Sequence, residues 1–332
     1  MKKSLLATAN LLALPALLAL SAPAALAAPR VVVSPYKFLP LNRAPDHAIG
    51  ARDATPYLRS KPAALTWAFA TGECGSETWR EQTGAQVAQA NVAAFAKAGV
   101  DYVISTGGQG GVFTCATDDG MERFLARYDS QHLAGIDFDI EAGQTKEQIA
   151  SLVQRAATAQ LKRPHLRFSF TVATHAASDG SRRSLNAQGE TILAAVRASA
   201  LRDWTFNLMV MDYGPPASDV CVLRGEVCDM GRSAVQAVRN VHGKYGIPLA
   251  QIEVTPMIGV NDVPRNDFTL ADARMLGAAV KDMGLAGLHW WSLDRDQPCK
   301  VPVQGASDRC SGMDGAAGAF DAAFREGLRD AR

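Results

Sequence analysis

The sequence predicts an α/β protein, a single-domain (β/α)8 TIM barrel. Strand-like apolar segments alternate with helix-like segments along the chain, which is typical of a parallel sheet covered by helices. Eight strand-like segments occur, the number that such a barrel requires. The 332 residues are 48% hydrophobic, enough to build one large core. A doubly wound open sheet is the alternative fold, but no GxGxxG sequence opens any of the helices, so we favour the closed barrel.

The expected strands are rich in apolar and β-branched residues, as in sheets that helices cover. They span residues 31–36, 65–71, 102–106, 135–141, 166–173, 206–213, 252–258 and 287–292.

Between these strands, apolar residues recur at spacings of three and four, which predicts amphipathic helices. The helices are expected around residues 87–95, 149–156, 192–196, 235–241, 273–283 and 320–328. Gly99 and Gly284 are positioned to end two of them. Thr269 and Asp272 resemble a capping box at the start of another. After the first strand, only residues 56–60 suggest a helix, and weakly.

Residues 1–28 have the layout of a secretory signal peptide. Lys2 and Lys3 precede an apolar run over residues 5–20, and small residues at 25–27 offer a cleavage site. A membrane anchor is the alternative, but the run is short for a span and no cluster of charges follows it. We therefore expect residues 29–332 to form the mature, exported domain, either extracellular or periplasmic, with no membrane attachment.

Composition limits the choice of partners. The formal net charge is +1, which argues against binding to nucleic acid or to an anionic membrane surface. We expect a monomer.

The six cysteines agree with export, because oxidising compartments permit disulfides. Cys221 lies close to Cys228 in the sequence, and Cys299 lies close to Cys310. Cys74 and Cys115 remain as a long-range pair. There is no CxxC and no accompanying histidine cluster, so a zinc ribbon is not expected. We predict three disulfides, with free thiols as the alternative.

The fourth expected strand carries a row of carboxylates. Side chains alternate across a strand, so Asp137, Asp139 and Glu141 share one face, while Ile136, Phe138 and Ile140 share the other. In a barrel the apolar face packs under the helices and the acids point into the lumen. Buried like charges resist joint ionisation, so such a row indicates a function. A solvated edge strand and a Mg²⁺ or Ca²⁺ site are the alternatives.

This row suits proton transfer to a glycosidic oxygen. Glu141 is last in the row and would lie at the carboxyl end of the barrel, where TIM-barrel enzymes place their active sites. The negative charge of Asp139 is expected to raise the proton affinity of Glu141, so that Glu141 acts as a general acid.

Residues 134–141 (AGIDFDIE) are similar to the fourth-strand motif DxxDxDxE of glycoside hydrolase family 18. Residues 105–108 (STGG) resemble the family's SxGG, residues 209–213 (MVMDY) its MxYD, and residues 287–294 its eighth strand with a tryptophan under the sugar. The forms of residues 211–214 and 255–259 resemble the bacterial and archaeal branch of single-domain chitinases. The resemblance spans nearly the whole mature chain.

The resemblance implies hydrolysis with retention, assisted by the substrate's own N-acetyl group. Glu141 would protonate the leaving oxygen and later activate water. Asp139 would stabilise the cyclic cation through the acetamido N–H, and Asp137 would share a proton or hydrogen bond with Asp139. No metal and no cofactor are implied.

The resemblance also implies substrate-binding residues. Trp291 matches the platform tryptophan, and its neighbour Trp290 should point into the core. Gly107 and Gly108 would let the backbone approach the ligand. Met209 and Asp212 match the motif of the sixth strand, and Asp212 would bind the sugar at subsite −1 or its acetamido group. Tyr36 and Trp79 are weaker subsite candidates.

Two positions depart from the family pattern. Ala134 stands where the first aspartate of the motif is usual, which shortens the row of acids. Met211 stands where MxYD has its tyrosine, whose hydroxyl holds the acetamido oxygen. We expect Tyr213, two residues further and so on the same face, to supply a hydroxyl instead.

The expected function is therefore that of a secreted chitinase acting on chitin or N-acetylglucosamine oligosaccharides. An endo-β-N-acetylglucosaminidase acting on other glycans would use the same chemistry. A lectin-like barrel that binds without cutting is an alternative from another class, although such proteins usually lose the acid. A metal-dependent hydrolase is the remaining alternative.

Overall fold

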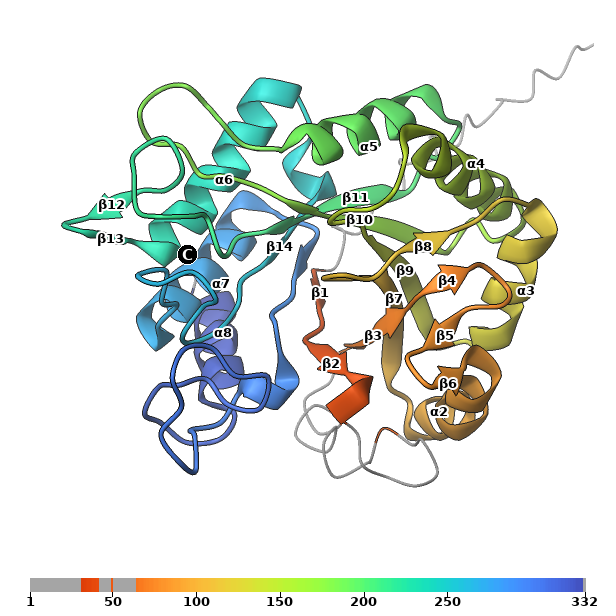
Figure 1. Cartoon of the computed structure of the whole chain (residues 1–332), viewed down its shortest axis with the longest axis horizontal. Helices are drawn as coiled ribbons and strands as arrows, with labels where there is room; N and C mark the ends of the chain where they lie inside the picture. The colour runs from red at the N-terminus through yellow and green to blue at the C-terminus, as the bar shows by residue number, and fades with distance from the viewer. Residues whose placement is uncertain (1–30, 42–48, 50–63, 331–332) are drawn as a thin grey trace, which may run out of the picture.

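The computed structural model describes residues 31–41, 49 and 64–330 (Figure 1). The expected signal peptide at 1–28 and the weak helix at 56–60 lie outside these residues. In the described part, parallel strands surround a central axis and helices lie around them.

The described strands form one closed parallel barrel, as predicted. Its neighbours follow the order β1, β15, β14, β11, β10, β9, β7, β3, β2. Their bounds are β1 Val32–Val33, β2 Tyr36–Phe38, β3 Ala64–Ala70, β7 Asp101–Gly107, β9 Leu133–Asp139, β10 Arg167–Ala173, β11 Trp204–Met209, β14 Ile252–Thr255 and β15 Gly287–Leu288. Among the described residues these correspond to the eight expected strands, because β1 and β2 are two halves of the first.

The first strand closes the barrel. The Ser34 N–H donates to the Leu288 carbonyl at 3.1 Å, on the β15 side. On the other side, the Thr66 N–H of β3 donates to the Pro35 carbonyl at 2.9 Å. The interruption between β1 and β2 therefore does not open the sheet.

Several strands end earlier than the sequence suggests. β9 ends at Asp139 and β11 at Met209, whereas the apolar pattern continues to Glu141 and Tyr213. The Ile140 N–H still donates to the Thr171 carbonyl at 3.1 Å, so β9 keeps one bond beyond its last residue. Apolar residues continue past these ends because the mouth loops are themselves packed, and a hydrophobic pattern cannot distinguish a buried loop from a strand.

The helices flank the barrel (Figure 1). Their bounds are α2 Gly84–Ala98, α3 Asp118–Tyr128, α4 Lys146–Lys162, α5 Ala187–Ala198, α6 Met230–Tyr245, α7 Leu270–Met283 and α8 Ala319–Asp330. Thr269 and Asp272 form the expected capping box, and Gly99 and Gly284 end their helices in the left-handed conformation. The sequence analysis missed α3, although Thr117 caps it by accepting the Gly120 N–H at 3.0 Å.

Several short elements occur in the loops of the described part of the chain. Three two-stranded pairs are β4 Gly72–Glu73 with β8 Phe113–Thr114, β5 Thr78–Trp79 with β6 Gln82–Thr83, and β12 Leu223–Arg224 with β13 Val227–Cys228. Three 3₁₀ turns are η1 Leu39–Leu41, η2 Leu249–Gln251 and η3 Leu293–Arg295.

The core between sheet and helices is rich in aromatic rings. Phe138 of β9 lies under the helices, and its ring stacks on Phe168 of β10 with centroids 5.9 Å apart. Trp290 is fully buried and stacks on Phe324 of α8 at 4.9 Å, which confirms its predicted core position. In the described part of the chain, no helix is long and apolar enough to cross a membrane.

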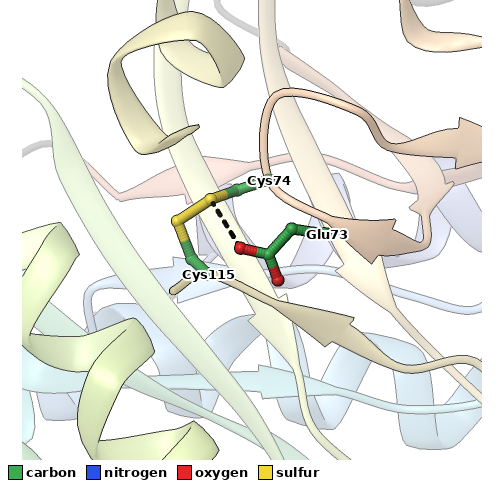
Figure 2. Close-up of side chains that lie close together, drawn as sticks. All are labelled: Glu73, Cys74 and Cys115. Carbon is green, nitrogen blue, oxygen red and sulfur yellow. Dashed lines mark hydrogen bonds between the residues drawn. A yellow bond between two sulfur atoms is a disulfide. The ribbon is translucent and has the colours of Figure 1, made fainter. Parts of the chain in front are cut away.

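All three predicted disulfides are present: Cys74–Cys115, Cys221–Cys228 and Cys299–Cys310. Cys74 follows β4 and Cys115 follows β8, so their bond fastens two loops at the barrel mouth. Figure 2 shows the Glu73 carboxylate beside this disulfide. Glu73 accepts hydrogen bonds from the Ala116 N–H and the Thr114 hydroxyl, both at 2.6 Å. Although Glu73, Cys74 and Cys115 lie within metal-ligand reach of one another, the disulfide leaves no thiolate to bind a metal.

A buried carboxylate attaches the last helix to the mouth. Asp296 accepts the N–H groups of Phe320 and Asp321, both at 2.9 Å, in the first turn of α8. Burial raises the pKa of Asp296 to about 6 despite these two bonds.

This raised pKa predicts a pH-dependent stability. The folded pKa lies above the unfolded value of 3.8, so the contribution of Asp296 is complete below about pH 4 and is lost as the pH rises through 6. The loss is at most about 3 kcal/mol. We expect Asp296→Asn to flatten the pH dependence of the free energy of unfolding over this window, as measured by urea denaturation at several pH values. Equal pH slopes for the two proteins would contradict the assignment.

Candidate active site

A cavity of about 590 Å³ opens at the carboxyl ends of the strands. Asp139 of β9, Ala173 of β10, Met209 of β11 and Thr255 of β14 all line it, and each stands at the end of its strand. Its other lining residues include Tyr36, Phe69, Gln109, Glu141, Thr171, Thr174, His175, Asn186, Met211, Asp212, Met257, Asp262, Trp291, Arg295, Ala306, Ser307 and Asp308. This is the end of a TIM barrel at which catalysis takes place.

Asp137 lies beneath the cavity in a cage of hydroxyl groups. One carboxylate oxygen accepts from Ser105 at 2.7 Å and Tyr36 at 2.9 Å. The other accepts from Thr171 at 2.7 Å and Ser169 at 2.8 Å. Burial raises the pKa of Asp137, and the four hydroxyl donors oppose that rise. The donors thereby favour the ionised form and fix the carboxylate in place.

Asp139 has a different environment although it lies only two residues away. It is 4% exposed, and its Oδ1 has no hydrogen-bond partner among the described residues. Burial raises the pKa of Asp139 well above its usual range, and the charges of Glu141 and Asp137 add to the effect. Its environment therefore favours the protonated form of Asp139 more strongly than an exposed position would.

Glu141 follows the strand and lies partly exposed in the cavity wall. Burial raises the pKa of Glu141, and the charge of Asp212 raises it further. The sequence predicts that the charge of Asp139 does this, whereas in the structure the charge is that of Asp212. Because Asp139 is the more deeply buried of the two, it is the charge of Glu141 that raises the pKa of Asp139.

Asp212 faces the cavity from the loop after β11. Its Oδ1 accepts the Val263 N–H at 2.9 Å, and its own N–H donates to the Asn261 side chain at 3.4 Å. Burial raises the pKa of Asp212, whereas the Val263 N–H lowers it. The loop after β14 thus holds this carboxylate in place.

Trp291 forms one wall of the cavity and belongs to an aromatic cluster. Its ring stacks on Phe69 with centroids 5.6 Å apart and an interplanar angle of 14°. Phe38 lies at 5.6 Å and Tyr36 at 6.2 Å from the same ring. The indole is therefore held rigidly, with its free surface toward the cavity.

Comparison with known proteins gives two curated relatives. The chain is 27% identical over 285 residues to a probable bifunctional chitinase/lysozyme of Escherichia coli, which covers 80% of this chain and 31% of that protein. It is 26% identical over 289 residues to endochitinase 11 of Metarhizium anisopliae, covering 81% of this chain and 53% of that protein. The chain thus spans between a third and about half of the length of these relatives. No family model matches the sequence.

Solved structures give the same fold. The catalytic domain of the hyperthermophilic chitinase of Pyrococcus furiosus superposes with a TM-score of 0.71 at 23% identity, covering 91% of this chain and 96% of that one. A site mutant of active domain 2 of a P. furiosus chitinase, complexed with chito-oligosaccharides, gives 0.70 at 22% identity, covering 91% and 95%. In this chain, Asp139 and Glu141 line the cavity at the carboxyl end of that barrel. The chain is thus similar in sequence to two chitinases and shares the barrel fold of chitinase catalytic domains.

One residue that the resemblance placed in the site lies elsewhere. Tyr213 does not line the cavity; its side chain is fully buried in the core. The expectation assumed strand alternation from Met211 to Tyr213, but β11 ends at Met209 and Asp212 has a φ of 45°. This left-handed residue breaks the alternation, so Met211 lines the cavity and Tyr213 turns inward.

The two glycines after β7 also act differently from the expectation. Gly107 and Gly108 are not among the residues that line the cavity, and both have positive φ, 84° and 77°. A Cβ on Gly107 would lie 2.1 Å from the Asp139 carbonyl oxygen, and the Gly108 N–H donates to that oxygen at 3.1 Å. These glycines let β7 support the backbone of Asp139 rather than admit the ligand.

The two weaker subsite candidates lie in different places, one in the cavity wall and one in the core. Tyr36 lines the cavity, as suggested. Trp79 is buried, and its indole N–H donates to the Tyr128 hydroxyl at 2.8 Å, so it belongs to the core under α3.

Sequence reasoning missed several residues of the cavity wall. Phe69, His175, Asp262 and Arg295 line it and belong to none of the motifs. Phe69 lies within the expected strand 65–71, near its carboxyl end, so its position was an available signal. His175 and Asp262 lie in loops and Arg295 ends the short turn η3, and the sequence does not specify the paths of these segments.

Proposed function

We propose that this protein hydrolyses the β-1,4 bonds between N-acetylglucosamine units of chitin or its oligosaccharides. The observation that carries the proposal is that the three acids of the row have three different environments. Asp137 accepts hydrogen bonds from four hydroxyls that oppose the rise of its pKa, Asp139 is buried with an oxygen that has no partner among the described residues, and Glu141 opens into the cavity with a raised pKa. A carboxylic acid that stays protonated at the mouth of a barrel is suited to general acid catalysis.

In the first step, Glu141 donates its proton to the glycosidic oxygen as the bond to the anomeric carbon breaks. The carbonyl oxygen of the substrate's N-acetyl group attacks that carbon and forms a cyclic oxazolinium ion. The unpartnered Oδ1 of Asp139 accepts the acetamido N–H and offsets the developing positive charge. Asp137 lies beneath Asp139, and hydroxyls from three strands fix its carboxylate there.

In the second step, Glu141 removes a proton from water. The resulting hydroxide attacks the anomeric carbon from the face that the leaving group vacated, and the oxazolinium ring opens to restore the N-acetyl group. Two inversions at one carbon give retention of configuration. Asp212 and the ring of Trp291 bind the sugar at the reacting subsite, with the aromatic face packed against the pyranose C–H groups.

Three disulfides support a place of action in an oxidising compartment, extracellular or periplasmic. Chitin and its oligosaccharides are the proposed partners, and the protein is proposed to act as a monomer without a metal or cofactor.

The test is the stereochemistry and the substrate requirement of the reaction. We expect release of a fluorophore from N-acetylchitooligosaccharide conjugates, with the β-anomer as the first product by proton NMR. The matching glucosamine conjugates, which lack the assisting acetyl group, should remain uncleaved, and EDTA should have no effect. An α-anomer first, or loss of activity in EDTA, would contradict the mechanism. A protein that cleaves nothing but still binds chitin would instead be a binding protein. The first substitution to try would then be Met211→Tyr, because Met211 stands where MxYD has its tyrosine.

A further inference from the structure

Arg295 is a buried cation in the cavity wall that the proposed mechanism does not use. It ends η3, has no exposed surface, and lines the cavity. Its Nη2 donates to the Val260 carbonyl at 2.6 Å and to the Ile258 carbonyl at 2.8 Å, and its Nε donates to Ile258 at 3.3 Å. Its Nη1 donates to the Ser307 carbonyl. All of these acceptors are backbone oxygens.

These carbonyls belong to two segments that the barrel itself does not connect. Ile258 and Val260 lie in the loop after β14, and Ser307 lies in the loop that the Cys299–Cys310 disulfide closes. The Val260 N–H also donates to the Ser311 carbonyl at 2.8 Å. One guanidinium thus joins both loops across the cavity wall, and its planar fork suits several acceptors at once.

The first segment leads directly to the residues that hold Asp212. Asn261 accepts the Asp212 N–H, and the Val263 N–H donates to the Asp212 carboxylate. The second segment supplies Ala306, Ser307 and Asp308 to the cavity. Arg295 therefore supports both Asp212 and the loop that the Cys299–Cys310 disulfide closes.

The charge of Arg295 is also placed among acids. Asp212, Asp262 and Asp308 are the carboxylates whose charges act on it. Burial lowers the pKa of Arg295 to about 10, so it remains a cation at neutral pH. Its charge in turn opposes the rise in the pKa of Asp212.

We propose that Arg295 is a positioning residue for substrate binding: it fixes Asp212 and the disulfide-closed loop against the sugar and balances the surrounding carboxylates. This inference rests on the proposed function, because the sugar is the ligand that Asp212 would bind.

The test compares Arg295→Met, which removes both charge and donors, with Arg295→Lys, which keeps the charge but not the fork. We expect Arg295→Met to raise KM for an N-acetylchitooligosaccharide at least ~10-fold while kcat falls less, since each lost bond to a charged group weakens the hold on Asp212. The KM of Arg295→Lys should lie between those of the wild type and of Arg295→Met. Binding to Glu141→Gln proteins carrying the same changes should weaken in parallel.

The pH profile separates positioning from simple loss of stability. Without the cation, Asp212 takes up its proton at a higher pH, so the acid limb of kcat/KM should move to higher pH in Arg295→Met and stay in place in Arg295→Lys. An Asp212→Asn background should abolish that shift. Arg127→Met is the matched control, because Arg127 pairs with Glu77 and binds the Gly75 carbonyl without lining the cavity. It should lower thermal stability with no change in KM.

The outcomes are distinguishable. A wild-type protein that neither cleaves nor binds the oligosaccharide would overturn the proposed function. An active wild type with unchanged KM and acid limb in Arg295→Met would overturn this inference alone. If Arg295→Met does not fold, the KM and acid limb of Arg295→Lys decide: a raised KM with an unmoved acid limb is the expected result, and an unchanged KM overturns the inference.

Discussion

Glu141→Gln is expected to lower kcat on N-acetylchitooligosaccharide conjugates by at least ~100-fold, the usual contribution of a general acid. Glutamine keeps the size of the side chain and its hydrogen-bonding groups but holds no transferable proton. Both proposed steps pass a proton through this carboxyl, so both are slowed. KM should change little, because the substitution leaves Asp212 and Trp291, the residues proposed to bind the sugar, in place.

The matched control for this variant is Glu147→Gln. Glu147 is exposed in the first turn of α4, six residues further along the chain and outside the cavity wall. It should retain wild-type kcat. Steady-state rates and oligosaccharide binding are the measurements. A Glu141→Gln protein that cleaves at more than a tenth of the wild-type rate would assign the acid to another group.

The pH profile of the wild type gives a second view of the same residue. Burial and the charge of Asp212 raise the pKa of Glu141, so the acid form persists to higher pH than in an exposed glutamate. The basic limb of kcat/KM reports its deprotonation. Asp212→Asn removes the neighbouring charge, and the basic limb should then move to lower pH.

The second large effect is expected at the opposite end of the barrel lumen. Glu253 of β14 is 1% exposed and pairs with Arg167 of β10, Oε1 to Nη1, at 2.8 Å. His289 approaches its other oxygen at 3.4 Å. Burial alone would raise the pKa of Glu253, but the charges of Arg167 and then His289 lower it to about 2. The lowered pKa means that its contribution to stability is complete above about pH 4.5 and is lost as the pH falls through 2.

Glu253→Leu is therefore expected to lower the free energy of unfolding by about 3–5 kcal/mol at neutral pH, because it leaves the mostly buried Arg167 without its partner. The double variant Glu253→Leu/Arg167→Met should recover part of that loss, since an apolar pair leaves no uncompensated charge. Urea denaturation measures both. Glu326→Gln is the control: it breaks the exposed pair with Arg274 and should cost less than ~1 kcal/mol. A loss of the same small size at Glu253 would show that the buried pair adds nothing.

The strand-and-helix order was predictable because it depends on local patterns. Alternation along residues 135–141 separates the acids from Phe138 whatever the rest of the chain does, and the barrel confirms both faces. The capping box at Thr269 and the left-handed Gly284 are likewise set by neighbours in sequence. Helix α3 was missed although Thr117 and the acids that follow it are a start signal of the same kind. The disulfides followed from the spacing of the cysteines.

The sequence-based predictions were wrong for residues beyond the end of a strand, where the alternation of side chains no longer applies. Tyr213 was assigned by strand alternation, which stops at Met209. Gly107 and Gly108 were assigned to the ligand, whereas the close approach that requires them is to the backbone of Asp139. A sequence pattern can indicate that a position requires glycine, but it does not indicate which group packs against that glycine in the fold.

The barrel, its disulfides and the three acids on one face could be predicted from local patterns, because strand alternation and cysteine spacing involve residues near one another in the sequence. The environment of each acid depends instead on contacts between distant segments. Tyr36, Ser105, Ser169 and Thr171 reach Asp137 from three strands, over sequence separations of 32 to 101 residues. Closure of the barrel brings these donors to Asp137 and leaves Asp139 without them, and it places Asp212 against Glu141. The row is thus divided into a carboxylate fixed by hydroxyls, a buried acid and a partly exposed acid as a result of that closure, since a pKa depends on the charges and donors that surround a group in space.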